Sequence, residues 1–570
     1  MSETPDLAGQ NPSVVAAAAD APAPERDAST LPAGRWLLAA AVFGLAAQYL
    51  FWGWPRYALG LNVFLVTALG LGLVVALATR ERVPRGTWPW LGLTLLWAVL
   101  FAWRAQAALR FWLGLAWAVS LAAALLAYNP GDAWQSTWVG WLLRLGEGFV
   151  AWLRGPVEAL REVLRGVTLH RAWKAVALGL VLLLPVLLCF VPILATADPV
   201  FARWWERFFA WETLWRWLAR LVWTAFFAWW WLALAAVAWY SRPRPQGLGH
   251  GALPAVSVAV VLGGVATLFA AFLAVQARFL FADDAALQAY GLTHAEYARE
   301  GFGQLVVVAV LTWLLLMVLD ALRRAPEGRG GRWVQALGGV LVLEVLLLLA
   351  SAAYRLGLYV QTYAWTATRL LVAVFMAWLV LVLLGVLWEW LRPAPHRWPR
   401  WALLLLLGMT ATYAALGPAD FIVRHNLRRA ARPLDVDTFY LVVSEELGPG
   451  RWVPLERALD DPAIAEEVRQ HLGAVIACYI VELREGYVPY GLGMDEARPD
   501  WRFWVAERMQ GEQAWLRLKA RVLQAYPTRQ VVIDDGTRHG YPTHQVSIDG
   551  QWRRCDTLLY PPAGAPWRSP

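Results

Sequence analysis

The sequence predicts a mostly α-helical membrane protein, a polytopic bundle of about 11 spans followed by a small C-terminal α+β extramembrane domain. Long apolar segments follow one another from Arg35 to Gly417, and arginines cluster in every second gap between them. Only 16% of the 570 residues are charged, whereas a soluble domain has about 25%. Tryptophan is also abundant, at 38 residues, as expected where indole rings line a membrane interface.

Residues 1–34 are rich in Ala, Pro, Asp and Ser and lack the apolar stretch of a signal peptide, so they predict a disordered tail. A membrane-spanning helix needs about 20 mostly apolar residues. Four such segments are expected within 35–128 and seven within 174–418. The eleven candidate spans are 36–53, 57–79, 88–103, 111–128, 175–196, 214–240, 254–277, 303–321, 333–353, 369–391 and 400–417.

Residues 129–173 differ from the spans because apolar residues recur there at helical spacing with arginines between them. Within 134–170 this pattern predicts one or two amphipathic helices, divided where Gly155 and Pro156 break the run. We expect them to lie on the inner membrane surface, with the apolar side down and arginines near anionic lipid headgroups. A cytoplasmic helical hairpin packed on the bundle is the alternative.

Residues 419–570 are near neutral, with 19 Lys+Arg and 21 Asp+Glu, and are long enough for a separate domain. Helical periodicity covers 463–480 and 501–524. Short strands are expected at 530–533 and 545–548, with a turn at Asp549 and Gly550.

The orientation follows from the basic residues. With the N-terminus inside, the inner gaps hold 18 Lys+Arg and the outer gaps 11. This bias predicts a cytoplasmic N-terminus, and an odd number of spans then makes the C-terminal domain extracytoplasmic. Four arginines after the last span oppose this assignment: Arg424, Arg428, Arg429 and Arg432.

Four stretches carry a family resemblance: 195–201, 293–305, 354–369, and 420–427 with the residues that follow to Leu441. Together they resemble the bacterial membrane-protein family called domain of unknown function 4173, with its close relative 4153, over roughly residues 170–460. The resemblance implies a multi-pass protein of the bacterial cytoplasmic membrane and no established activity. One departure lies at Ala364-Trp365-Thr366, where members of that family usually have Gly first.

In the predicted topology these stretches all fall at outer ends of spans, where their polar side chains form one layer. One hypothesis is a site for an anionic or polar ligand, in which arginines form bidentate hydrogen bonds with a carboxylate or phosphate group. The other is a structural network of ion pairs that holds the outer loops. The candidate residues are Asp198, Glu296, Tyr297, Arg299, Arg355, Arg369, Asp420, Arg424 and Asn426.

Glu344 is a carboxylate near the middle of the span at 333–353. Such a residue is a functional-site hypothesis, either as a proton relay or as a cation ligand. The alternative is a protonated side chain that forms a hydrogen bond with a neighbouring span.

Cys478 and Cys555 are expected to form a disulfide if the C-terminal domain faces an oxidising compartment. We expect no metal site, because the spacing of His539, His544 and the nearby acids fits no standard template. The sequence contains no nucleotide-binding loop, serine-hydrolase elbow or zinc-protease motif, so no cofactor and no enzyme activity are expected. Nucleic acid is not an expected partner, since the excess basic residues lie in loops beside apolar segments.

Three functional hypotheses remain. The first is a non-enzymatic sensor, assembly or structural protein whose C-terminal domain contacts an unknown protein partner, with the lipid bilayer as the other partner. The second is a secondary transporter or channel that uses Glu344. The third is a membrane-embedded enzyme that acts on a lipid-linked substrate.

Overall fold

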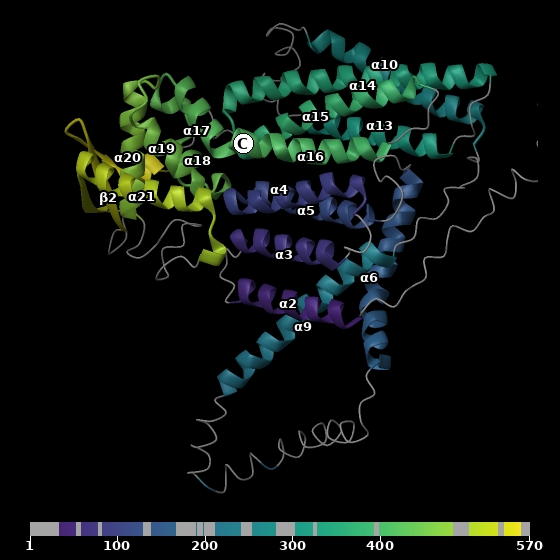
Figure 1. The fold of residues 1–570 in the computed structure, drawn as a ribbon. Helices are drawn as coiled ribbons and strands as arrows, with labels where there is room; N and C mark the ends of the chain where they lie inside the picture. Colours follow the sequence, from purple (N-terminus) through teal and green to yellow (C-terminus); the bar gives the residue numbers. More distant parts are fainter. Residues whose placement is uncertain are drawn as a thin grey trace, which may run out of the picture. The chain divides into compact units, whose positions relative to one another are not determined.

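The structure is a computed structural model that describes residues 33–52, 59–77, 83–128, 138–166, 190, 198, 211–240, 253–280, 302–322, 328–392, 398–482, 501–533 and 541–559 (Figure 1). The expected tail at 1–34 and the expected span at 175–196 lie almost wholly outside these ranges. The described chain divides into two units, 1–45 with 154–232 and 46–153 with 233–570. The second unit therefore contains both the main helix bundle and the C-terminal residues.

The bundle is built from long apolar helices because their lengths and compositions suit the interior of a lipid bilayer. Its helices are α3 (Leu61–Leu77), α4 (Trp88–Trp103), α5 (Ala107–Leu126), α10 (Ala255–Leu280), α13 (Phe302–Leu322), α14 (Gly328–Tyr363), α15 (Ala367–Trp390) and α16 (Trp398–Leu416). These apolar helices make the chain a membrane-embedded protein.

The expected number of spans, about eleven, is not established. Among the described residues, eight helices are long and apolar enough to cross a membrane. Helix α3 is shorter, at 17 residues. Helix α16 passes the same test only together with α17 (Pro418–Arg429), and the two are bent by 55°. The bend occurs at Gly417, whose left-handed backbone (φ 61°) favours glycine.

Several tryptophans pack inside the bundle instead of lining its interface. A Cβ atom added at Gly338, Gly385 or Gly408 would overlap the indole ring of Trp390, Trp401 or Trp378, respectively. The missing side chains thus create notches for large rings, and Trp390 is fully buried. The expectation that tryptophans near span ends lie at the interface suits exposed Trp88 and Trp388, but it is wrong for Trp390.

The C-terminal part is here called the C-terminal domain. It has α17, α18 (Thr438–Val442), α19 (Trp452–Ala458), α20 (Glu466–Glu482), α21 (Ala506–Ala525) and α22 (Cys555–Leu559) around one small sheet. Its antiparallel strands are β1 (Thr528–Ile533), β2 (Tyr541–Ile548) and β3 (Gln551–Arg554), in that order. The sequence predicted β1 and β2 but not β3. Asp549 and Gly550 form the β2–β3 turn, both with positive φ (49° and 80°), as a tight two-residue hairpin requires.

The amphipathic segment is one continuous helix, α6 (Trp138–Gly166), with Pro156 inside it. The predicted break at Gly155 and Pro156 is therefore wrong. A proline removes one backbone donor, and the rest of the hydrogen-bond ladder holds the helix together here.

Helices α2 (Ala33–Phe51) and α9 (Trp211–Tyr240) each run from one unit into the other. Within the first unit they pack through aromatic rings. Trp36 and Phe43 of α2 each have a ring centroid 5.9 Å from that of Trp231 on α9. Trp231 is 2% exposed, whereas Trp229 and Trp230 are more than 40% exposed. Within the Trp229–Trp231 run, Trp231 therefore packs against α2, and the other two side chains face outward.

Candidate functional site

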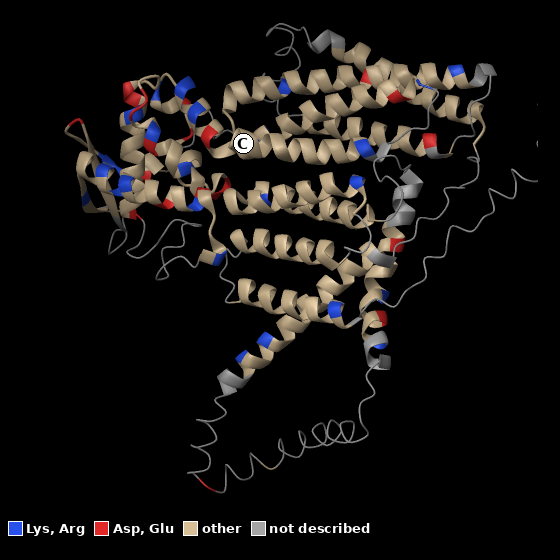
Figure 2. Cartoon of the chain, viewed as in Figure 1, with Lys and Arg blue, Asp and Glu red and all other residues tan. Residues whose placement is uncertain are grey.

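Two turns between bundle helices lie against the C-terminal domain, at the same end of the bundle (Figure 1). One is the α4–α5 turn at Arg104–Gln106, and the other is the α14–α15 turn at Ala364–Thr366. Figure 2 shows that charged residues are sparse along the bundle helices and gather on the C-terminal domain. The polar groups between the two turns and the domain are here called the junction layer. They are Arg104, Gln106, Ala364–Arg369, Tyr413, Asn426, Tyr440, Glu446 and Glu507.

Glu507 joins helix α21 to the α4–α5 turn. Its carboxylate accepts the backbone N–H of Ala105 at 2.6 Å and lies 3.7 Å from the guanidinium of Arg104. Burial raises the pKa of Glu507, and the neighbouring Arg104 opposes that shift. Arg104 also donates to the carbonyl of Ala414 on α16, at 2.5 Å. The α4–α5 turn is therefore bound both by Glu507 of the C-terminal domain and by Ala414 of the bundle helix α16.

Gln106 and Tyr413 connect the two turns through the bundle. The amide of Gln106 donates to the carbonyl of Glu446 at 3.1 Å and to the hydroxyl of Tyr413 at 3.4 Å. The Tyr413 hydroxyl in turn donates to the carbonyl of Ala367 at 3.2 Å. This chain of hydrogen bonds links the start of α5 to the start of α15.

Tyr440 on α18 fixes the start of α15 from the domain side. The hydroxyl of Tyr440 accepts the backbone N–H of Ala367 at 2.8 Å and donates to the carboxylate of Glu446 at 3.0 Å. Burial raises the pKa of Tyr440, and the Glu446 carboxylate adds to the effect, so the phenol stays protonated and able to donate.

Asn426 on α17 pairs with the backbone of Trp365 in the same way that a neighbouring strand would. Its side-chain oxygen accepts the Trp365 N–H at 2.9 Å, and its amide donates to the Trp365 carbonyl at 2.8 Å. The preceding residue, Ala364, has a left-handed backbone with φ of 60°. Such a conformation is costly for any residue with a Cβ atom.

Arg369 closes the α14–α15 turn from within the bundle. Its guanidinium donates to the carbonyls of Tyr363 at 2.6 Å and Ala364 at 2.5 Å. It also lies 4.2 Å from the centre of the Tyr359 ring, which adds a cation–π contact. Arg369 therefore stabilises the strained turn with its own donors.

The model of the family described as Domain of unknown function (DUF4153) matches residues 91–455. The chain belongs to this family. No curated protein and no solved structure matches it. The sequence resemblance named family 4173 first, and the family that matches, 4153, is its close relative.

The DUF4153 match begins within α4 and ends within α19, so it covers both turns, Asn426 and Tyr440. Glu507, the sheet and the two disulfide cysteines lie beyond it. The match also starts earlier than the expected range of roughly 170–460, because it includes α4 and α5. The Ala364 position, where relatives were expected to carry Gly, is the position with the left-handed backbone.

The structure places part of the predicted polar layer in the junction layer. Arg369 and Asn426 lie there, although they bind backbone groups of the chain. Arg355 is buried on α14, and Asp420 pairs with Arg424 one turn along α17. Asp198 is an exposed residue of the first unit. Glu296, Tyr297 and Arg299 lie outside the described residues, so their predicted role stays a prediction.

Sequence reasoning missed Gln106, Tyr413 and Glu507. Each is a lone polar residue with a partner 307 to 402 positions away in the chain. The only signal at Glu507 is an acid in the first turn of a helix, which is common because it suits the helix dipole. No spacing pattern distinguishes it from Glu512 on the same helix.

Glu344 lies on α14, between the exposed side chain of Leu343 and the buried side chain of Val345. One carboxylate oxygen, Oε2, is buried and has no hydrogen-bond partner among the residues whose side chains are described.

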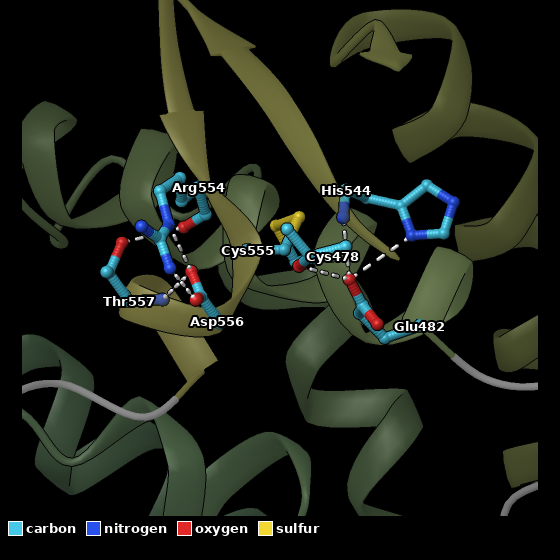
Figure 3. Close-up of a disulfide and its surroundings, with 8 residues drawn as sticks. Cys478, Glu482, His544, Arg554, Cys555, Asp556 and Thr557 are labelled. Carbon is cyan, nitrogen blue, oxygen red and sulfur yellow. Dashed lines mark hydrogen bonds and ion pairs between the residues drawn. A yellow bond between two sulfur atoms is a disulfide. The ribbon is translucent and has the colours of Figure 1, made fainter. Parts of the chain in front are cut away.

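Cys478 on α20 and Cys555 at the start of α22 are joined by a disulfide, and both are fully buried (Figure 3). One turn after Cys478, the carboxylate of Glu482 accepts from the His544 backbone at 2.9 Å and from Thr543 Oγ1 at 3.0 Å. The described part of the chain contains no group of three His, Cys, Asp or Glu residues suited to a metal ion. His539 falls outside that part.

Proposed function

We propose that this protein is a non-enzymatic membrane protein whose C-terminal domain contacts another molecule and is mechanically coupled to the helix bundle, in a sensor or assembly role. The observation that carries the proposal is the contact of Glu507 with Arg104 and Ala105. A carboxylate of the domain holds the tip of one helical hairpin, while Asn426 and Tyr440 hold the tip of another.

The junction layer supports coupling because its bonds go to backbone atoms. A bond to the backbone of Ala105, Trp365 or Ala367 fixes the position of the turn itself, whichever side chains surround it. A displacement of the domain would therefore pull on both hairpins. A site built for a small ligand would instead aim these donors and acceptors into open space.

In this proposal the C-terminal domain is extracytoplasmic and the membrane is the bacterial cytoplasmic membrane. The excess of basic residues in alternate gaps and the Cys478–Cys555 disulfide support that orientation. The opposing arginines have structural partners: Arg428 pairs with Asp461 at 2.9 Å, and Arg429 donates to the carbonyl of Val360 at 3.1 Å. A large domain after the last span translocates largely regardless of such charges, so these arginines carry less weight in setting the topology.

Reporter fusions after Arg332 and after Pro570 test the orientation. We expect the first fusion to report the cytoplasm and the second the outer side. A cytoplasmic signal from the second fusion would contradict the proposed orientation.

Photo-crosslinking tests the contact with another molecule. A photoreactive amino acid is placed on the exposed sheet at Val532 or Trp552, and at Leu343 as an exposed bundle control. In cells that express the chain at its natural level, we expect discrete protein adducts from the two sheet positions and none from Leu343. A lack of adducts from both sheet positions would contradict the assembly role.

The buried Oε2 atom of Glu344 supports a second candidate, proton or cation transport. Proteoliposomes that contain a pH-sensitive dye test it, with Glu389→Gln as the matched control because Glu389 pairs with Arg400. Transport predicts a proton flux that Glu344→Gln abolishes and Glu389→Gln retains. The same basal leak in all three preparations would argue against it.

A further inference from the structure

Helix α6 has three different faces along the part whose side chains are described, residues 145–161. One face is buried and consists of small residues, Gly148, Ala151 and Gly155. A second face is apolar and exposed, here called the apolar stripe, and consists of Leu145, Phe149, Leu153 and Leu160. The third face is charged and consists of Glu147, Arg154, Glu158 and Arg161.

The buried face shows where the helix lies. A Cβ atom added at Gly148 would be 3.2 Å from Leu126 and 3.4 Å from Val237. Leu126 is the last residue of α5, and Val237 is the second-last residue of the apolar part of α9. Helix α6 therefore crosses two membrane-length helices at their ends. The part of α6 that shares a unit with α4 and α5, residues 138–153, runs crosswise to them (Figure 1).

This position identifies what covers the apolar stripe. The ends of membrane-length helices lie at the boundary between acyl chains and headgroups. A helix that crosses them there runs parallel to the membrane plane, as interfacial amphipathic helices do. Phe149 is 60% exposed and Leu153 is 50% exposed, so the stripe has apolar area available for lipid.

We propose that α6 is a membrane-surface helix whose apolar stripe, Leu145, Phe149, Leu153 and Leu160, is buried among lipid acyl chains. Over the whole helix four arginines stand against three glutamates, a net charge of only +1, so apolar burial supplies most of the attraction. This differs from the expectation of arginines near anionic headgroups. Within 145–161, attraction to a negative surface is offset by equal repulsion.

Depth-dependent quenching in the full-length protein tests the proposal. In a Cys189→Ser background, the variants Phe149→Cys and Leu153→Cys report the apolar stripe, and Arg154→Cys is the matched control on the charged face. Each is labelled with an environment-sensitive fluorophore in nanodiscs. We expect doxyl-labelled lipid chains to quench positions 149 and 153 on the order of threefold more than position 154, and aqueous iodide to show the reverse order.

Three outcomes would overturn the proposal. Strong iodide quenching at 149 and 153 would show that the stripe faces water. Protection of both positions from iodide and from doxyl lipid would show that protein covers them, either another segment of this chain or a second copy. The order of quenching should also persist when anionic lipid is omitted, and a loss of lipid quenching at 149 without anionic lipid would contradict burial driven by apolar contact.

Discussion

The carboxylate of Glu507 accepts the backbone N–H of Ala105 at 2.6 Å, across 402 positions of sequence. The acceptor belongs to the first turn of α21 in the C-terminal domain, and the donor belongs to the α4–α5 turn of the bundle. This bond ties the last third of the chain to helices near its beginning. The C-terminal domain and the bundle belong to the same folded unit.

The left-handed Ala364 predicts a stabilising substitution. Ala364→Gly removes the Cβ atom that makes φ of 60° costly, so we expect the free energy of unfolding to rise by about 1 kcal/mol. Thermal unfolding of the purified protein in detergent measures the change. The control is Ala367→Gly, in the first turn of α15, which should destabilise. A loss of stability in Ala364→Gly would contradict the strained turn.

Asn426→Ala should destabilise the protein by about 2 kcal/mol. The substitution removes both hydrogen bonds to Trp365 and leaves that N–H and carbonyl without their partner. Chemical unfolding followed by intrinsic fluorescence measures the loss. Arg521→Ala serves as a comparison, because its ion pair with Asp460 is exposed and should be worth less than about 1 kcal/mol. Equal effects of the two substitutions would argue against the backbone clamp.

His471 predicts acid sensitivity. Burial, together with the nearby Arg553, lowers its pKa from 6.5 to about 4. Between these values the unfolded chain binds a proton that the folded domain excludes, so stability falls as the pH drops from 6.5 towards 4. We expect a loss of about 2 kcal/mol over that window. The slope of unfolding free energy against pH should flatten in His471→Gln, and an unchanged slope would exclude His471 as its source.

The disulfide gives a chemical prediction. Unreduced protein unfolded in denaturant should take up one maleimide-PEG label, at Cys189, and reduced and unfolded protein should take up three, because Cys478 and Cys555 pair. Closing a loop with a sequence separation of 77 stabilises the fold by about 4 kcal/mol in the chain-entropy estimate. Cys478→Ser should therefore lower the unfolding temperature. Three labels on unreduced, unfolded protein would show that the bond is absent.

The sequence predicted the apolar helices well because length and composition alone make a helix suitable for a bilayer. It could not establish their number. Helix α3 is only 17 residues long, and α16 continues into α17 through a bend at Gly417 that the apolar pattern does not show. Burial of Trp390 was also missed, since the notch that receives its ring is made by Gly338, 52 positions away.

The candidate site was predicted only in part. Arg369 and Asn426 were selected because charged and polar groups near a membrane boundary need partners. Their partners are backbone groups of Ala364 and Trp365, which have no side-chain signature in a sequence. Glu507 could not be selected at all, because its role depends on a long-range contact with Ala105 and Arg104.

Peptide-resolved hydrogen exchange in nanodiscs tests the central claim, that the C-terminal domain holds the bundle turns through the junction layer. In the wild-type protein we predict slow exchange at Ala105 and Ala367, whose N–H groups donate to Glu507 and Tyr440. Glu507→Ala should speed exchange at Ala105 on the order of tenfold and leave Ala367 unchanged, while Glu512→Ala, on the same helix, should change neither. Fast exchange at both positions in the wild type, or unchanged exchange at Ala105 in Glu507→Ala, would contradict the account.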